Sequence, residues 1–132
     1  GSQALVGMVD YKDGYVYFEK GKLKSKYLVE DWCKRIIELG IGEIILHDIS
    51  RDGIGEGYDI ETIRRIVNSS SIPIIGLGGA GEYFDLVECF KNANPSGVGI
   101  GNLLHFKEHS YYHAKQLLLK SKIDVRKEWG VF

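Results

Sequence analysis

The stretch IPIIGLGGAG, residues 72–81, joins an apolar, β-branched run to a cluster of glycines. A second stretch of the same kind, SGVGIGN, spans residues 96–102. Such runs predict buried strands, and the glycines that follow them leave backbone N–H groups free to approach an anion. Two turns of this kind side by side form a phosphate cradle. The first ligand to consider is therefore a small phosphorylated metabolite.

Outward from these stretches, the chain alternates strands with helices. Apolar runs predict further strands at residues 4–9, which should be buried on both faces, and at residues 43–46. Apolar residues at helical spacing predict helices from Val29 to Gly40, after a cap at Asp59, and at residues 107–120. A further helix should turn an apolar stripe inward, made of Tyr83, Phe84, Val87 and Phe90. Residues 12–26 alternate YVYF with the turn-rich segments DG and KGK, which predicts a short hairpin.

Four strands, each followed by a helix, predict a single α/β domain over residues 1–132 with a parallel sheet and right-handed crossovers. At 132 residues the chain is well short of the ~250 of a complete (βα)8 barrel. In parallel α/β folds the reactive groups lie beyond the carboxyl ends of the strands. We therefore expect residues 10–12, 47–57, 77–81 and 101–102 to share one edge of the sheet.

The composition excludes several classes of function. Hydrophobic residues make up 44% of the chain and charged residues 27%, with a net charge of -1, which is typical of globular proteins and provides no basic surface for nucleic acid. Cys33 and Cys89 lie among apolar residues, which predicts two reduced core thiols and a cytoplasmic protein. No apolar run approaches the ~20 residues of a membrane span. We expect neither nucleic acid nor a membrane as partner.

Four segments resemble one enzyme family in order and spacing: GSQALVGMVDYK, GEIILHDISRDGIGEGYD, IPIIGLGGAGEYFDLVECF and LLHFKEHSYYHAKQLL. They resemble the second half, from the fifth strand to the last helix, of the cyclase subunit of imidazole glycerol phosphate synthase. The resemblance implies half of a (βα)8 TIM barrel, with four parallel βα units and a hairpin after the first strand. It implies ammonia-dependent cyclisation in histidine biosynthesis, which yields imidazole glycerol phosphate and aminoimidazole carboxamide ribotide. It also implies a glutaminase subunit as the source of ammonia, and no cofactor.

The resemblance assigns roles to residues at the strand ends. Asp10 corresponds to the family's second catalytic aspartate, whose role is general acid or base chemistry. The first catalytic aspartate belongs to a strand without a counterpart here, so we expect this chain alone to bind phosphate and to be inactive. The segments that match the family's phosphate and substrate contacts contain Asp52, Gly53, Gly78, Gly79, Gly101 and Asn102. Alternatively, these glycines only let strand and helix pack closely.

The sequence departs from the family at the reaction centre. His47 and Ser50 stand where the family has threonine and aspartate, and Leu77 and Ile54 replace small polar and hydroxyl residues. His47 either transfers protons or only hydrogen-bonds a loop, and Ser50 is a candidate substrate contact. These departures favour a paralogue that delivers ammonia to a sugar amidotransferase in surface-polysaccharide synthesis. A third reading is a non-catalytic half-barrel that binds phosphate.

Half of a barrel creates a surface that a lone molecule tolerates poorly. Cutting a closed barrel exposes two sheet edges and the apolar inner face. We therefore expect this chain to form homo-oligomers through the cut face, or to pair with a separate first half.

A histidine series near the carboxyl end has the spacing of one helical face. His105, His109 and His113 recur every four residues. No carboxylate or cysteine completes an obvious ligand set, so we expect no metal site there.

Overall fold

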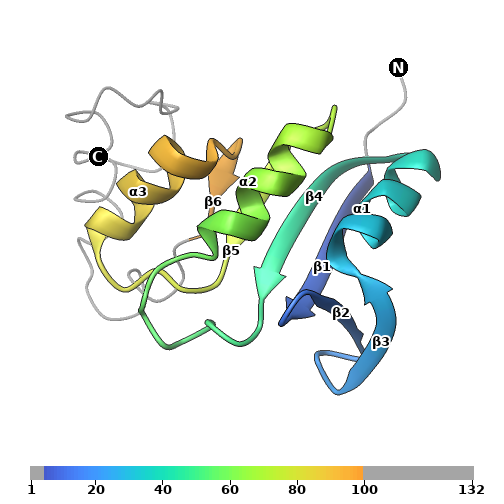
Figure 1. Cartoon of the computed structure of the whole chain (residues 1–132), viewed down its shortest axis with the longest axis horizontal. Coiled ribbons are helices and arrows are strands. Elements are labelled where there is room, and N and C mark those ends of the chain that lie inside the picture. The colour runs from blue at the N-terminus through green and yellow to red at the C-terminus, as the bar shows by residue number, and fades with distance from the viewer. Residues whose placement is uncertain (1–4, 100–132) are drawn as a thin grey trace.

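A six-stranded sheet with helices on one of its faces organises the molecule (Figure 1). The computed structural model describes residues 5–99. The strands lie in the order β3-β2-β1-β4-β5-β6. Their bounds are β1 (Leu5–Lys12), β2 (Tyr15–Phe18), β3 (Leu23–Leu28), β4 (Ile41–Asp48), β5 (Ile74–Leu77) and β6 (Gly97–Val98). The helices are α1 (Val29–Glu38), α2 (Ile60–Ser69) and α3 (Tyr83–Ala93).

The strands β1, β4, β5 and β6 are parallel neighbours, each joined to the next through a helix. The strands β2 and β3 form the predicted hairpin after β1 and extend the sheet with antiparallel pairing. The sheet is open, as half of a barrel must be. The predicted α/β class, half of a (βα)8 barrel, is therefore confirmed. The strand boundaries differ from expectation: β1 and β4 extend past the predicted runs, and β5 begins after Pro73, which has no N–H to donate within a sheet.

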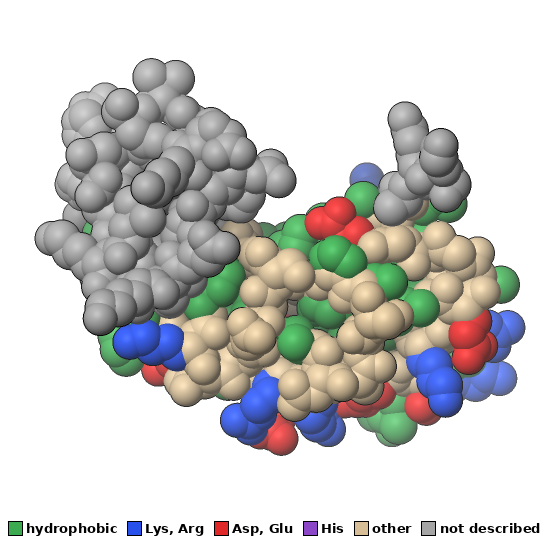
Figure 2. Space-filling model, turned by 90° about the horizontal axis from the view of Figure 1, so that it is seen from above, with side chains coloured by type: hydrophobic (Ala, Val, Ile, Leu, Met, Phe, Trp, Pro, Cys, Tyr) green, Lys and Arg blue, Asp and Glu red, His purple; other side chains and the backbone are tan. Residues whose placement is uncertain are grey.

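The two faces of the sheet differ in burial. On the helix-covered face Val9, Ile44 and Ile74 are at most 2% exposed. On the opposite face of β1, Val6 is 54% and Met8 58% exposed. The prediction that the first strand is buried on both faces is wrong, because the helices cover only one of them. Seen from above, charged side chains gather along one rim and hydrophobic ones lie across the middle (Figure 2).

Sequence signals explain the ends of α1 and α2. Asp59 caps α2 as predicted, and its Oδ1 accepts a hydrogen bond from the Thr62 N–H at 3.2 Å. After α1, Gly40 has a φ of +108°, a conformation that side-chain-bearing residues avoid. Asp59 therefore marks where the chain enters α2, and Gly40 marks where it leaves α1 for β4.

The start of α3 is held by a carboxylate of its own first turn. Asp85 Oδ2 accepts hydrogen bonds from the amides of Gly81 and Glu82 at 2.8 and 2.9 Å. The predicted inward stripe is wrong at Phe84, which is 61% exposed. Leu86 faces the core instead, and Phe84 lies two residues earlier, about 200° around the helix.

The hairpin packs firmly on α1. Val16 of β2 is 1% exposed. The Phe18 ring of β2 meets the Trp32 ring edge-on, with centroids 5.3 Å apart. The Tyr27 ring of β3 lies tilted against the same Trp32 ring, with centroids 5.0 Å apart. These contacts join both hairpin strands to one aromatic residue of α1.

Cys33 and Cys89 are buried and free, so the prediction of two core thiols is confirmed. Burial raises the pKa of each thiol to about 12. Neither thiol therefore ionises in the folded chain near neutral pH.

Several predictions fall outside residues 5–99: the helix at 107–120, the three histidines, and Gly101 with Asn102 of the phosphate cradle. Within the described part of the chain, no helix combines the length and the hydropathy needed to cross a bilayer.

Candidate functional site

Two of the predicted site residues meet at the carboxyl edge of the sheet. Asp10 of β1 and His47 of β4 are register partners on neighbouring strands, so both side chains point to the face that the helices leave open. His47 Nδ1 lies 3.0 Å from Asp10 Oδ1. The side chains are 19% and 22% exposed, respectively. The pair is thus shielded from bulk water on most sides yet open to a ligand.

Asp52 reaches the same histidine from the loop after β4. Its Oδ2 lies 3.3 Å from His47 Nε2, and its side chain is 57% exposed. Each ring nitrogen therefore faces a different carboxylate, and a proton can enter the ring on one side and leave on the other. Among residues 5–99, no group of three or more His, Cys, Asp or Glu is arranged to hold a metal ion.

The loop that carries Asp52 is anchored by a buried carboxylate. Asp48 is 4% exposed, and its Oδ1 accepts hydrogen bonds from the Ser50 amide at 3.0 Å and the Ser50 hydroxyl at 2.6 Å. Arg51 Nε lies 3.3 Å from Asp48 Oδ2, and Arg51 also donates to the Gly57 carbonyl at 3.2 Å. These bonds fold the loop back on itself and fix the position of Asp52.

The predicted glycine turn lies one strand further along the same edge. Leu77, the last residue of β5, is the register partner of His47, and Gly78 and Gly79 follow it with φ of +96° and +118°. A Cβ on Gly78 would lie 2.6 Å from the Asp48 carbonyl oxygen, and one on Gly79 would overlap the Gly57 carbonyl. The turn therefore interlocks with the loop after β4, and close packing is one reason for its glycines.

Gly53 has a different environment from Gly78 and Gly79. Its φ is +82°, and a Cβ there would meet nothing within 4 Å. Packing therefore does not require a glycine at this position; only the backbone conformation favours one.

A buried tyrosine ties β1 to the start of α2. The Tyr11 hydroxyl donates to Asp59 Oδ2 at 3.1 Å. Burial, reinforced by the negative charge of Asp59, raises the Tyr11 pKa well above its usual range, so the hydroxyl remains a donor. This bond therefore joins the carboxyl end of β1 to the start of α2.

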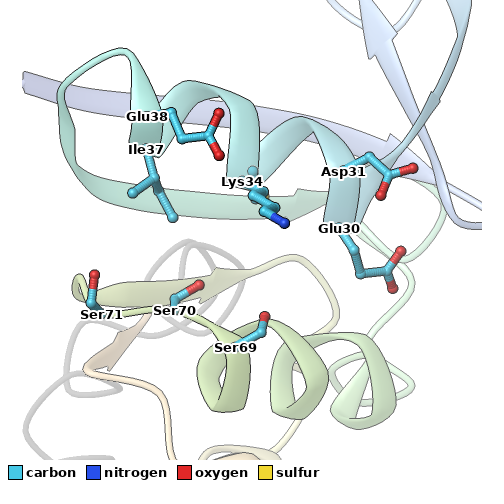
Figure 3. A pocket seen from close by; sticks show the side chains of 9 residues that line it. Glu30, Asp31, Lys34, Ile37, Glu38, Ser69, Ser70 and Ser71 are labelled. Atoms are coloured by element: carbon cyan, nitrogen blue, oxygen red, sulfur yellow. The ribbon is translucent and has the colours of Figure 1, made fainter.

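A cavity of about 330 Å³ lies elsewhere, between α1 and the end of α2 (Figure 3). Charged side chains of α1 and the hydroxyls of Ser69, Ser70 and Ser71 line it. At one end Glu30 Oε1 forms an ion pair with Arg65 at 3.0 Å. The cavity is on the helix-covered side of the sheet, so it is not part of the Asp10–His47 site.

Comparison with known proteins fits this arrangement. Residues 1–110 match the family model described as histidine biosynthesis protein. The chain belongs to this family. It is 38% identical over 130 residues to the imidazole glycerol phosphate synthase subunit HisF of Chlorobaculum parvum. It is 40% identical over 130 residues to that of Chlorobium phaeovibrioides and 36% identical over 132 residues to that of Alkaliphilus metalliredigens.

Each of these matches covers 96% of this chain and 52% of the relative. The chain spans about half the length of the curated relatives it matches. The predicted resemblance is therefore confirmed. The chain is a member of the histidine biosynthesis protein family, and it is similar to HisF subunits over about half of their length.

The predicted site residues of this family member separate into three groups. Asp10, His47 and Asp52 are in contact, whereas the Ser50 side chain is turned onto Asp48 and away from the strand-edge pair. The glycines Gly53, Gly78 and Gly79 lie in the two loops beside that pair.

One functional contact was not predicted. The contact between His47 and Asp52 joins the end of β4 to the loop that follows it, and the signal for it was the DISRDG stretch, in which Asp48 and Arg51 bend the loop.

Proposed function

We propose that this chain supplies the second half of a cyclase subunit of the imidazole glycerol phosphate synthase type. The observation that carries the proposal is the Asp10–His47 contact at the carboxyl edge, one strand from the glycine turn. Similarity to HisF subunits over about half of their length supports it. In this proposal the glycine turn binds one phosphate of the substrate.

The proposed chemistry is proton transfer during ammonia addition and ring closure. Asp10 acts as general base or acid on the substrate, and His47 relays the proton between Asp10 and Asp52. The amides of Gly81 and Glu82 are already bonded to Asp85, so the phosphate oxygens are left to the amides of residues 78–80 and of Gly53. Gly101 and Asn102 complete the cradle in this proposal.

The chain alone is proposed to be inactive, since it contains one of the two catalytic aspartates that the resemblance implies. The uncovered face around Val6 and Met8 needs a partner surface, which is either the other half of the barrel or a second copy of this chain. Light scattering distinguishes these cases: the isolated chain should be an oligomer, and a stable monomer contradicts the proposed homo-oligomer. A glutaminase subunit would supply ammonia to the complete assembly.

One observation favours a second candidate, an ammonia-delivering paralogue that serves a sugar amidotransferase. His47 Nδ1 contacts Oδ1 of Asp10, the residue expected to act on the substrate. If that contact persists when ligand binds, Asp10 Oδ1 is occupied by His47 and does not take part in cyclisation.

The decisive experiment combines this chain with the first half of the Chlorobaculum parvum subunit and supplies ammonium salt. Formation of aminoimidazole carboxamide ribotide from the doubly phosphorylated substrate measures cyclisation. We expect turnover that Asp10→Asn reduces by about a hundredfold or more, in the range usual for a general acid or base. His47→Thr, which restores the residue that the resemblance places there, should retain more activity than His47→Ala.

Assembly of the two halves must be verified by size-exclusion chromatography. An assembled complex without turnover contradicts the cyclase proposal and favours the paralogue. Binding of phosphate by such an inactive complex would identify a non-catalytic half-barrel.

A further inference from the structure

The hairpin continues the row of side chains that begins at the glycine turn. Tyr17 of β2 is the register partner of Asp10, and Lys24 of β3 is the register partner of Tyr17. Partners in a sheet project to the same face. His47, Asp10, Tyr17 and Lys24 therefore form one row across four neighbouring strands, on the face that the helices leave open.

The hairpin is fixed from behind, which holds this row in place. The opposite side chains of β2, Val16 and Phe18, pack toward α1, where Phe18 meets Trp32. The Val29 amide donates to the Gly14 carbonyl at 2.9 Å and ties the first turn of the hairpin to the start of α1. The second turn approaches the loop after β4, because a Cβ on Gly21 would lie 3.2 Å from Ile49 Cδ1. The front of the hairpin is therefore a rigid surface.

The side chains on this front surface include aromatic rings and ammonium groups that are not buried in the core. Lys24 Nζ lies 4.6 Å from the centroid of the Tyr15 ring, so the ammonium is held over one aromatic face. Tyr17 is half-buried, and its side chain has no hydrogen bond or ring contact with any residue between 5 and 99. Lys12, the register partner of Tyr15, adds a second exposed ammonium. The Tyr17 side chain is therefore the neighbour of Asp10, and the two lysines lie on the same face, Lys12 two residues along β1 and Lys24 two strands away.

We infer that Tyr17 and the Lys24–Tyr15 pair form a second wall of the site, which binds the planar ring and an anionic group of a nucleotide-like ligand. The inference rests on the proposed function and extends it to the part of the ligand remote from the glycine turn. Three strand spacings separate β5 from β2, or about 14 Å at the usual distance between strands. A doubly phosphorylated, ring-containing substrate spans such a distance, whereas a single phosphate does not.

Calorimetric binding of two probes to the full chain, without ammonia, tests this wall. The long probe is the doubly phosphorylated nucleotide-like substrate of the cyclase reaction, and the short probe is inorganic phosphate. Tyr17→Leu should weaken binding of the long probe about tenfold and leave the short probe within about twofold. Tyr17→Phe, which keeps the ring, should stay within about twofold of wild type for both probes.

Lys26 provides a matched charge control for Lys24. Its ammonium lies 5.8 Å from the centroid of the Tyr27 ring, which contacts Trp32 of α1 in a tilted arrangement. Lys24→Gln should weaken the long probe about fivefold or more, and Lys26→Gln, with the same change in net charge, about twofold or less. An unchanged near-ultraviolet circular dichroism spectrum would show that the aromatic cluster behind the hairpin is intact.

The outcomes separate this inference from the proposed function. Unchanged affinity for the long probe in both Tyr17→Leu and Lys24→Gln overturns the wall and leaves the proposed function standing. Equal losses in Tyr17→Phe and Tyr17→Leu overturn the stacking role. A wild-type chain that binds phosphate but not the long probe overturns the wall as well. Failure to bind either probe overturns the proposed function, and the wall with it.

Discussion

Replacing Gly79 with alanine separates the packing role of the glycine turn from its proposed role in binding. At φ +118° the backbone lies beyond the left-handed region that an alanine tolerates, which costs about 1–3 kcal/mol. The new methyl group would also displace the Gly57 carbonyl and break the 2.7 Å hydrogen bond from the Gly57 amide to the Gly79 carbonyl, worth about 1 kcal/mol. We expect a total loss of about 3 kcal/mol in the free energy of unfolding.

Gly53→Ala is the matched control. It also places a Cβ on a residue with positive φ, but in open space, so we expect a loss of only about 1 kcal/mol. Urea unfolding followed by circular dichroism measures both variants, and equal m-values would show that the midpoints are comparable. If Gly79→Ala costs no more than Gly53→Ala, the two loops do not interlock as described. Phosphate affinity measured on the same proteins then shows whether Gly53, which packing leaves free, contributes to binding.

Two further predictions concern buried groups. Asp48→Ala leaves the Ser50 amide and the Arg51 guanidinium without their buried acceptor. We therefore expect the free energy of unfolding, measured in urea, to fall by about 2–3 kcal/mol, and phosphate binding to weaken. Wild-type stability would contradict the anchoring role. Burial raises the pKa of the Cys33 and Cys89 thiols from 9.0 to about 12. Between these two pH values only the unfolded chain loses the thiol protons. The free energy of unfolding should therefore fall as the pH rises from 9 toward 12. The double Cys→Ala variant should show a shallower decline over that range, and an identical slope would refute the assignment.

The sequence predicts the parallel strands and the helices between them well, because apolar runs and helical stripes report directly on burial against the helix layer. It also predicts that Asp10 and His47 share an edge, since both follow directly from strand ends. The apolar run at residues 4–9 does not by itself predict that Val6 and Met8 are exposed, because such a run looks the same whether one face or both are covered. The expectation of half a barrel, with its inner face uncovered, does predict it. Phe84 was misassigned for a related reason: a stripe of four apolar residues does not say which of them the helix turns outward.

The loop after β4 shows why the candidate site was only partly predictable. The position of Asp52 depends on the bonds of Asp48 with Ser50 and Arg51, and on those of Arg51 with a carbonyl six residues later. Such bonds depend on the path of the loop, which no periodicity encodes. The same limit applies to Tyr17, whose place beside Asp10 follows from the hairpin register alone.

The departures from the family at this edge are physically coupled. The resemblance places an aspartate at position 50 and a threonine at position 47. In this chain the carboxylate is instead at Asp48, and Ser50 donates to it through both its amide and its hydroxyl. An aspartate at position 50 would set two carboxylates against each other at a 4% exposed site, so Ser50 is the residue that makes a buried Asp48 tolerable. With the loop anchored in this way, Asp52 is free to approach His47, and the histidine gains its second carboxylate. His47, Asp48 and Ser50 are therefore coupled, because the bonds between Asp48 and Ser50 hold the loop that places Asp52 beside His47, and His47 in turn contacts Asp10.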